Sequence, residues 1–356
     1  MKKAYLVLNN GQVFEGLRIG AEGDGLGELV FTTGMTGYLE TLTDPSYAGQ
    51  IILHTFPLIG NYGVIPEDFE GPCLAKGYVV RELCGTPSNF RSEYALDRFL
   101  KEHSIPGICA VDTRALTRII REEGVMNALI CDEVPADLAP IRSYAVRGGV
   151  RTASCTEPRI FPAEGAERFR VALLDYGAKH HIVESLTERG CRVTVLPHDT
   201  AAEDVLALRP DGLMLSNGPG DPKENVFEIA QLKKLIGRLP VFGICLGHQL
   251  AALALGGETV KLKYGHRGAN QPVKDLKTGR CFITSQNHGY AVLAESVAHL
   301  GRLRCVNAND LSCEGLDYPA LRCFTVQFHP EASAGPHDTG FLFDRFVGMM
   351  GGGDDA

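Results

Sequence analysis

Residues 240–250, Pro-Val-Phe-Gly-Ile-Cys-Leu-Gly-His-Gln-Leu, constrain the fold of this chain more than any other segment. An apolar run that suits a buried strand ends there, and an Ala/Leu-rich pattern typical of a helix begins just after Cys245. Gly243 and Gly247 permit a sharp turn from strand to helix, which exposes the cysteine in front of the positive end of the helix. Because a helix N-terminus and a nearby imidazole stabilise the reactive thiolate, Cys245 is a candidate nucleophile. An inert buried thiol is the alternative for a cysteine considered alone.

A histidine and a carboxylate far downstream complete a catalytic set. His329 and Glu331 follow the strand-like run Phe-Thr-Val-Gln-Phe at residues 324–328, and their spacing lets both leave the strand end on one side. Cys245, His329 and Glu331 would then be nucleophile, base and orienting carboxylate, the thiol form of a hydrolytic triad. Alone, His329 would be more typical of a hydrogen-bonded structural histidine, but its pairing with Glu331 favours the base.

The sequence pattern around Cys245 alternates between strand and helix. We expect strands at residues 171–174, 192–196, 212–215 and 240–244, and helices at residues 179–189 and 226–236. This alternation predicts an α/β fold with a mostly parallel sheet and helices on both faces. Ligands gather at the carboxyl ends of the strands in such sheets, where Cys245 and the loop after Leu215 fall.

The first part of the chain predicts a separate α+β domain, and a length of 356 residues suits two domains. Short strands are expected at residues 5–8, 12–14, 28–32 and 51–56, and helices after the capping residues Ser92 and Asp112. We therefore divide the chain into an N-terminal domain at residues 1–150, a linker rich in Arg, Gly, Pro and acidic residues at 151–169, and a second domain at 170–350.

Composition excludes several classes of function. With 35 Lys and Arg against 43 Asp and Glu, the net charge is −8, which argues against non-specific binding of nucleic acid or anionic membranes. The N-terminal apolar run is too short for a signal peptide, and no stretch approaches transmembrane length. Eleven cysteines without a CxxC pair indicate neither a disulfide framework nor a zinc site. We expect a cytoplasmic protein without a metal.

Three other polar or glycine-rich motifs allow more than one interpretation. Backbone amides of the loop Ser-Asn-Gly-Pro-Gly-Asp-Pro at residues 216–222 could join that of Leu246 in an oxyanion hole, although the loop alone could be a plain tight turn. Gln-Asn-His-Gly-Tyr at residues 286–290 suits a pocket wall or a solvated turn. Gly-Asp-Gly-Leu-Gly at residues 23–27 is not a phosphate loop, because its spacing is wrong and no Lys-Ser/Thr follows.

Two ambiguous residues lie beside these motifs. Asp221 lies near the end of the loop without an evident role, and His248 lies three residues past Cys245 on the expected helix. That position favours a packing or supporting role for His248 over a role as the general base.

Three motifs together resemble the class I, or triad, glutamine amidotransferases. They are Asn-Gly-Pro-Gly-Asp-Pro at residues 217–222, Gly-Ile-Cys-Leu-Gly-His-Gln at 243–249 and His-Pro-Glu at 329–331, in the order of that family. The resemblance implies that Cys245 attacks the side-chain amide of glutamine to give a glutamyl thioester. It also implies that His329 carries the proton to the leaving ammonia and that Glu331 orients His329.

Motifs of the front half narrow the resemblance to the small subunits of carbamoyl-phosphate synthases. Thr-Gly-Met-Thr-Gly-Tyr at residues 33–38, Thr-Asp-Pro-Ser-Tyr at 43–47 and Pro-Leu-Ile-Gly-Asn-Tyr-Gly at 57–63 are similar to that family, as is Pro-Glu-Ala-Ser-Ala-Gly-Pro-His-Asp at 330–338. The similarity runs from about residue 3 to 347. By this resemblance, the glutamine-binding positions are Ser46, Gly218, Gly220, Leu246, Gln249, Asn287, Gly289 and Tyr290, the last standing where many relatives have Phe.

The family also implies a partner. Ammonia would pass through an internal channel to a large subunit that uses ATP and Mg²⁺ to make carbamoyl phosphate from bicarbonate, for arginine and pyrimidine synthesis. No cofactor is expected on this chain, which has no P-loop, and the two subunits would form a heterodimer or a higher oligomer. The alternatives are a glutaminase subunit of another synthase, a non-catalytic scaffold that activates the large subunit, and a free-standing cysteine hydrolase.

Overall fold

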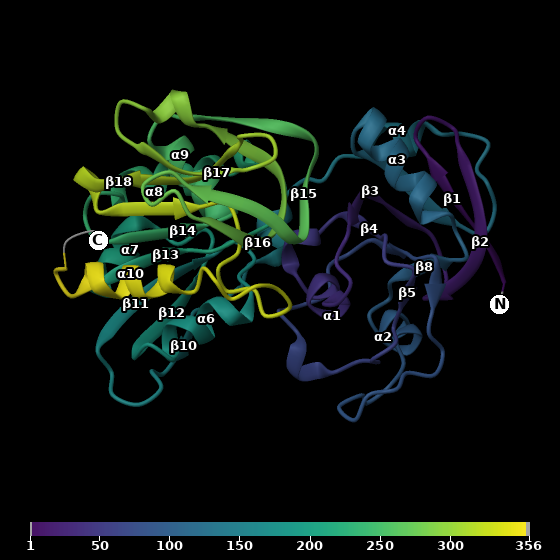
Figure 1. The fold of residues 1–356 in the computed structure, drawn as a ribbon, viewed down its shortest axis with the longest axis horizontal. Coiled ribbons are helices and arrows are strands. Elements are labelled where there is room, and N and C mark those ends of the chain that lie inside the picture. The colour runs from purple at the N-terminus through teal and green to yellow at the C-terminus, as the bar shows by residue number, and fades with distance from the viewer. Residues whose placement is uncertain (1, 354–356) are drawn as a thin grey trace. The chain divides into compact units, whose positions relative to one another are not determined.

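The computed structural model describes residues 2–353 and divides into two compact units, residues 1–147 and residues 148–356 (Figure 1). Among the described residues, no helix is both long enough and apolar enough to cross a membrane.

The first unit is built on a closed barrel of seven strands in the order β1-β2-β8-β6-β4-β3-β9. Closure comes from the antiparallel pairing of β1 with both β2 and β9, and β3, β4, β6 and β8 pair in parallel along the other side. The strands of this unit are β1 (Lys3–Leu8), β2 (Val13–Gly20), β3 (Gly25–Thr32), β4 (Gln50–His54), β5 (Leu58–Ile59), β6 (Gly77–Val79), β7 (Glu82–Leu83), β8 (Pro106–Cys109) and β9 (Met126–Cys131). The short strands predicted from the sequence are present, but their closure into a barrel was not predicted.

The helices of the first unit confirm one predicted cap and correct another. Its helices are α1 (Tyr38–Leu42), α2 (Leu96–Glu102), α3 (Thr113–Glu123) and α4 (Ala139–Ser143). Asp112 caps α3 by accepting a hydrogen bond from the Ala115 amide at 2.9 Å. The prediction that Ser92 caps a helix is wrong. Tyr94 forms a β-bridge with Val64, which holds this segment extended, so α2 begins only at Leu96.

The second unit contains a ten-stranded sheet in the order β10-β12-β11-β13-β14-β19-β18-β17-β15-β16. Its strands are β10 (Arg159–Phe161), β11 (Phe169–Asp175), β12 (Cys191–Pro197), β13 (Gly212–Leu215), β14 (Val241–Ile244), β15 (Glu258–Asp275), β16 (Cys281–Leu293), β17 (Arg302–Asn307), β18 (Cys313–Tyr318) and β19 (Cys323–Val326). The five strands from β12 to β19 in this order pair in parallel, as the alternating sequence pattern predicts. The other pairings of the sheet are antiparallel, and these long hairpins were not predicted.

Helices cover both faces of the parallel part, as predicted. Those of the second unit are α5 (Gly149–Ala153), α6 (His180–Thr187), α7 (Ala202–Ala207), α8 (Val226–Leu235), α9 (Leu246–Ala254) and α10 (Phe341–Met350). Successive strand residues alternate between two cores: Leu173 and Met214 pack with α6 and α10, whereas Ala172 and Leu213 pack with α7, α8 and α9. Residues 151–169, where we expect a linker, contain the end of α5 and the edge strand β10.

The last strand is placed near the middle of the sheet. β19 lies between β14 and β18, so it joins the parallel part to the antiparallel part. Its carboxyl end therefore lies next to that of β14, and the residues that follow these two strands are brought together.

Candidate active site

Cys245 occupies the turn between β14 and α9, as the sequence predicts. It is a non-glycine residue with a positive φ of 53° and a ψ of −102°, a conformation that costs about 1–3 kcal/mol. Its amide donates to the Val326 carbonyl at 2.8 Å, which ties the turn to β19. Cys245 is 2% exposed, and its thiol donates to the Asn287 carbonyl across a Sγ–O distance of 3.7 Å. The neighbouring strands thus hold the strained turn in place.

Gly247 lets α9 begin close to the sheet. A Cβ atom at this position would lie 2.4 Å from the Leu215 carbonyl oxygen, well inside contact distance. Its amide donates to the Ser216 carbonyl at 3.0 Å, so the first turn of α9 rests directly on the end of β13. The close packing of α9 on β13 therefore requires a glycine at position 247.

His329 and Glu331 follow β19 and form a buried pair. The Nδ1 atom of His329 lies 2.7 Å from Oε1 of Glu331, and these residues are 1% and 5% exposed. The His329 amide donates to the Ser285 carbonyl at 2.9 Å, which fixes the segment against β16. Nε2 of His329 is buried and makes no hydrogen bond of regular geometry within residues 2–353. That nitrogen is the one available to the Cys245 sulfur and to a substrate.

Lys179 is a buried cation of the site that the sequence analysis missed. It lies at the start of α6, beyond the carboxyl end of β11, and its Nζ is 3.6 Å from Oε1 of Glu331. Its side chain is only 9% exposed. Its amide donates to the Asn217 side-chain oxygen at 3.1 Å, which joins α6 to the loop after β13. A lone lysine at a helix start has no local signal, and only the general expectation that ligands gather at strand ends could have indicated it.

Charges control the protonation of the His329–Glu331 pair. Burial and the Lys179 ammonium lower the pKa of the His329 imidazole, but Glu331 and Cys245 outweigh them and raise it to about 10. Burial raises the pKa of the Glu331 carboxyl, but His329 and Lys179 outweigh this effect and hold it at about 2. At neutral pH the pair is therefore an imidazolium and a carboxylate.

Residues 286–290 line the site as part of β16 rather than as a turn. The Asn287 carbonyl accepts the Cys245 thiol, and the Tyr290 carbonyl accepts the Gln249 side-chain amide at 3.0 Å. Gln249 also donates to the Gln327 side chain at 3.0 Å, so α9 is linked to both β16 and the segment after β19. Gly289 lies between Asn287 and Tyr290 on the same strand. The structure thus brings this predicted group beside Cys245.

The loop at residues 216–222 closes the site from the end of β13. Gly218 packs tightly, because a Cβ atom there would lie 2.3 Å from the Tyr176 carbonyl oxygen. Gly220 has a positive φ of 91°. Asp221 accepts from the Lys223 amide at 2.9 Å and so caps the short 3₁₀ turn at residues 222–224, which explains this previously ambiguous residue.

Two other residues singled out from the sequence have partners within their own units. His248 is buried, its Nδ1 lies 2.8 Å from the Thr325 hydroxyl, and burial lowers the pKa of its imidazole to about 3. This arrangement fits the packing role expected for it. Ser46 belongs to the first unit, where its amide donates to the Asp44 carboxylate at 2.9 Å. Its participation in glutamine binding remains a prediction.

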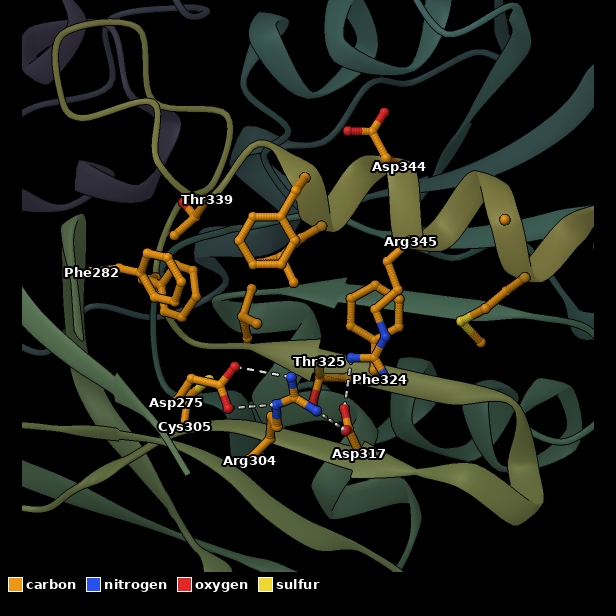
Figure 2. Close-up of a pocket in the computed structure, with 16 residues that line it drawn as sticks. Asp275, Phe282, Arg304, Cys305, Asp317, Phe324, Thr325, Thr339, Asp344 and Arg345 are labelled. Atoms are coloured by element: carbon orange, nitrogen blue, oxygen red, sulfur yellow. Dashed lines mark hydrogen bonds and ion pairs between the residues drawn. The ribbon is translucent and has the colours of Figure 1, made fainter. Parts of the chain in front are cut away.

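A separate cavity of about 360 Å³ lies between α10 and the sheet (Figure 2). Its walls combine aromatic and aliphatic side chains with charged groups, and the charged groups are paired. Arg304 contacts Asp275 at 2.9 Å, and Arg345 contacts Asp317 at 2.8 Å. Neither Cys245 nor its partner imidazole lines the cavity, so it is not the candidate active site.

Comparison with known proteins agrees with this geometry. A family model described as "Carbamoyl-phosphate synthase small chain, CPSase domain" matches residues 6–130, and one described as "Glutamine amidotransferase class-I" matches residues 172–349. The carbamoyl phosphate synthase small chain of Oceanobacillus iheyensis is 49% identical over 356 residues, which cover 98% of this chain and 96% of that protein. The chain belongs to the carbamoyl phosphate synthase small chain family.

Other small chains are equally similar. The carbamoyl phosphate synthase small chain of Fusobacterium nucleatum is 51% identical and covers 98% of each chain. That of Listeria monocytogenes is 49% identical and covers 100% of this chain and 99% of the other. The predicted family, the α/β fold class and the glutamine amidotransferase class of enzyme are therefore confirmed.

Proposed function

We propose that this chain hydrolyses glutamine through a Cys245 thioester and supplies the ammonia to a large subunit of carbamoyl-phosphate synthase. The observation that carries the proposal is the strained Cys245 turn beside a buried imidazolium–carboxylate pair. Family membership supports the choice of glutamine as substrate and of a large chain as partner.

The first half of the reaction forms the thioester. The Cys245 sulfur attacks the side-chain amide carbon of glutamine to form a C–S bond, and the carbonyl electrons move onto oxygen. When the carbonyl re-forms, the C–N bond breaks and the nitrogen leaves as ammonia with the proton held on Nε2 of His329. Glu331 keeps that imidazole oriented through Nδ1.

The second half releases glutamate. Water attacks the thioester carbon, His329 accepts the water proton, and the C–S bond breaks to return the sulfur. In both halves the developing oxyanion needs donors. The Leu246 amide is in the first turn of α9, where backbone amides have no acceptor within the helix. We assign it to the oxyanion hole together with amides of the Gly218 and Gly220 loop.

The remaining substrate contacts follow the family positions. Gln249, Asn287, Gly289 and Tyr290 would hold the amino-acid part of glutamine, and Ser46 would add a contact from the first unit. We also propose that the carbamoyl phosphate produced with the large subunit, which would hold ATP and Mg²⁺, feeds arginine and pyrimidine synthesis. The eleven free cysteines fit a reducing cytoplasm for this work.

Replacement of the nucleophile tests the proposal. Cys245→Ser should abolish glutamine hydrolysis while the fold is retained, because a serine hydroxyl without its own tuned base is a far weaker nucleophile. Cys281→Ser is the matched control, since Cys281 is exposed at the start of β16 and should keep wild-type activity. Glutamate release is the assay, and circular dichroism checks the fold. Wild-type-like hydrolysis by the Cys245 variant would exclude Cys245 as the nucleophile.

A further inference from the structure

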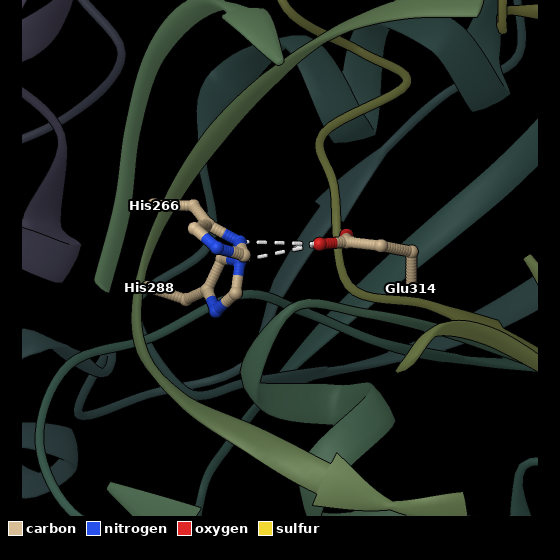
Figure 3. A group of neighbouring side chains, drawn as sticks. All are labelled: His266, His288 and Glu314. Atoms are coloured by element: carbon tan, nitrogen blue, oxygen red, sulfur yellow. Dashed lines mark hydrogen bonds and ion pairs between the residues drawn. The ribbon is translucent and has the colours of Figure 1, made fainter. Parts of the chain in front are cut away.

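A buried cluster of two histidines and a glutamate includes His288, which belongs to the segment at residues 286–290. His266 is on β15, His288 on β16 and Glu314 on β18, and one ligand atom from each lies within 4.8 Å of the others. Figure 3 shows the Glu314 carboxylate directed at both imidazole rings. His266 is 9% exposed, His288 4% and Glu314 fully buried. None of the three has a place in the proposed glutaminase reaction.

The outer hydrogen bonds of the two rings fix where their lone pairs point. Nδ1 of His288 lies 2.8 Å from the Tyr290 carbonyl, which can only accept, so this nitrogen carries the hydrogen. Nε2 of His266 lies 2.8 Å from the Asp310 carboxylate and donates to it. In each neutral ring the other nitrogen therefore carries no hydrogen and presents a lone pair. A second bond of this kind, to a carboxylate or a backbone carbonyl, is what orients histidines that bind metals.

Both lone pairs face oxygen atoms that are also acceptors. Nδ1 of His266 is 3.3 Å from Oε1 of Glu314, and Nε2 of His288 is 3.8 Å from the same oxygen. Nε2 of His288 is also 3.1 Å from Oε1 of Gln286. The Gln286 amide is fixed in this orientation, because its NH₂ donates to the Thr284 hydroxyl, which itself donates to the Gln271 carbonyl.

The cluster also leaves a buried charge incompletely matched. Oε2 of Glu314 is buried without a hydrogen-bond partner within residues 2–353. The Asn307 side-chain amide reaches Oε1 of Glu314 and Nδ1 of His266 only at 3.5 and 3.4 Å. A buried carboxylate without full pairing is costly. One proton on His266 would satisfy one lone pair. A second proton, on His288, would bring two cations together in rings whose centroids are 4.9 Å apart.

We propose that His266, His288 and Glu314 bind a divalent cation of the zinc class. Zinc binds histidine nitrogen and carboxylate oxygen at about 2.0–2.2 Å, which places neighbouring ligand atoms of a tetrahedral site about 3.3–3.5 Å apart. The two nitrogens lie 3.3 and 3.8 Å from Oε1 of Glu314, close to this spacing, and within 4.8 Å of one another, so the rings need to move together to bind one ion. Oε1 of Gln286 or a water would complete the coordination. One divalent cation also balances the Glu314 and Asp310 carboxylates.

This cation would join three strands at the proposed substrate segment. His288 lies between Asn287 and Gly289, so a metal bond to its ring would hold that part of β16 against β15 and β18. From the sequence we expect no metal on this chain, because its cysteines lack a CxxC pair. The three ligands proposed here are far apart in the sequence, so no local spacing indicates them.

Metal analysis of the full-length chain tests the site. The probe is Zn²⁺ alone, with binding measured by competition against a chromophoric chelator and by elemental analysis after desalting. Wild type should hold about one Zn²⁺ per chain. His266→Gln and Glu314→Gln should each bind at least about 100-fold more weakly, since even the loss of an outer partner costs 10- to 100-fold. Unfolding curves establish whether each variant is folded.

Glu228→Gln is the matched control. Glu228 is also a buried carboxylate paired with a histidine, His198, but it is not among the grouped metal ligands, so its replacement should leave zinc binding unchanged. Co²⁺ bound to wild type should show visible bands of a tetrahedral N/O site without the near-ultraviolet band of thiolate ligation. The proposal would be overturned if wild type binds no zinc. It would also be overturned if folded Glu314→Gln or His266→Gln binds zinc as tightly as wild type does. Thiolate ligation would overturn it as well, because it would locate the metal at cysteines. A proton on His266, rather than a metal ion, would then lie between that ring and the Glu314 carboxylate.

Discussion

His329 and Glu331 are expected to contribute unequally to glutamine hydrolysis. His329→Asn removes the group that transfers the proton, which typically costs on the order of 10²–10⁴-fold in rate. Glu331→Gln should cost less, because the imidazole remains and only its orientation and charge partner are lost. Steady-state glutaminase kinetics of the two variants are the measurement. A Glu331 variant clearly slower than the His329 variant would contradict these roles.

The pH dependence of Glu331→Gln reports on the ion pair between His329 and Glu331. Glu331 raises the pKa of His329, so its loss lowers that pKa and removes the imidazolium at a lower pH. In Glu331→Gln the alkaline limb of the pH–rate profile should therefore move to lower pH than in wild type, whose limb is set by a pKa of about 10. An alkaline limb that stays in place would show that the limb does not report His329.

Replacement of Lys179 should move both limbs of the pH–rate profile in the same direction. Its ammonium lowers the pKa of His329 and that of Glu331, so Lys179→Met should raise both and move the acid and alkaline limbs of the profile to higher pH. Lys233→Met, at an exposed position on α8, is the control and should leave both limbs unchanged. Limbs that stay fixed in Lys179→Met would mean that the lysine serves packing alone.

The start of α9 allows a prediction about an element. Gly247→Ala places a methyl group 2.4 Å from the Leu215 carbonyl, so the helix must move away from β13. Overpacking of this kind costs about 1–3 kcal/mol in the free energy of unfolding, and glutaminase activity should fall because the shift displaces Cys245. Urea denaturation and the glutaminase assay measure the two effects.

Gly348→Ala is the control for that change. Gly348 is an exposed glycine inside α10, and a Cβ atom there would meet nothing within 4 Å. Alanine should therefore stabilise the helix by roughly 0.5–1 kcal/mol without affecting activity. Equal effects of the two substitutions would show that contact with Leu215 is not what requires Gly247.

Local signals in the sequence predict some elements and not others. The turn at Cys245 has glycines on both sides and a change from strand to helix pattern, so a few neighbouring residues are enough to predict its conformation. Lys179 has no such signal, and its role depends on how β11 is ordered beside β13 in the sheet. The helix expected after Ser92 fails for a related reason, because a bridge from the distant Val64 decides the conformation there.

Reconstitution tests the division of labour within the whole enzyme. A complex of Cys245→Ala with the large subunit should make no carbamoyl phosphate from glutamine but should make it from an ammonium salt, because only the ammonia-releasing step is lost. Carbamoyl phosphate formed from each nitrogen source is measured, with wild type in parallel. Failure with both sources, although the complex assembles, would mean that this chain takes part in the synthetic step itself.

The position of β19 has a consequence for how the protein is made. A ribosome delivers β14 and its cysteine about 80 residues before the strand that must insert beside it, and chains fold as they emerge. Until β19 arrives, the sheet cannot pair across its middle and the thiol has no imidazole beside it. The nascent chain therefore carries a cysteine without its base, and glutamine hydrolysis can begin only after residues 323–331 have been synthesised.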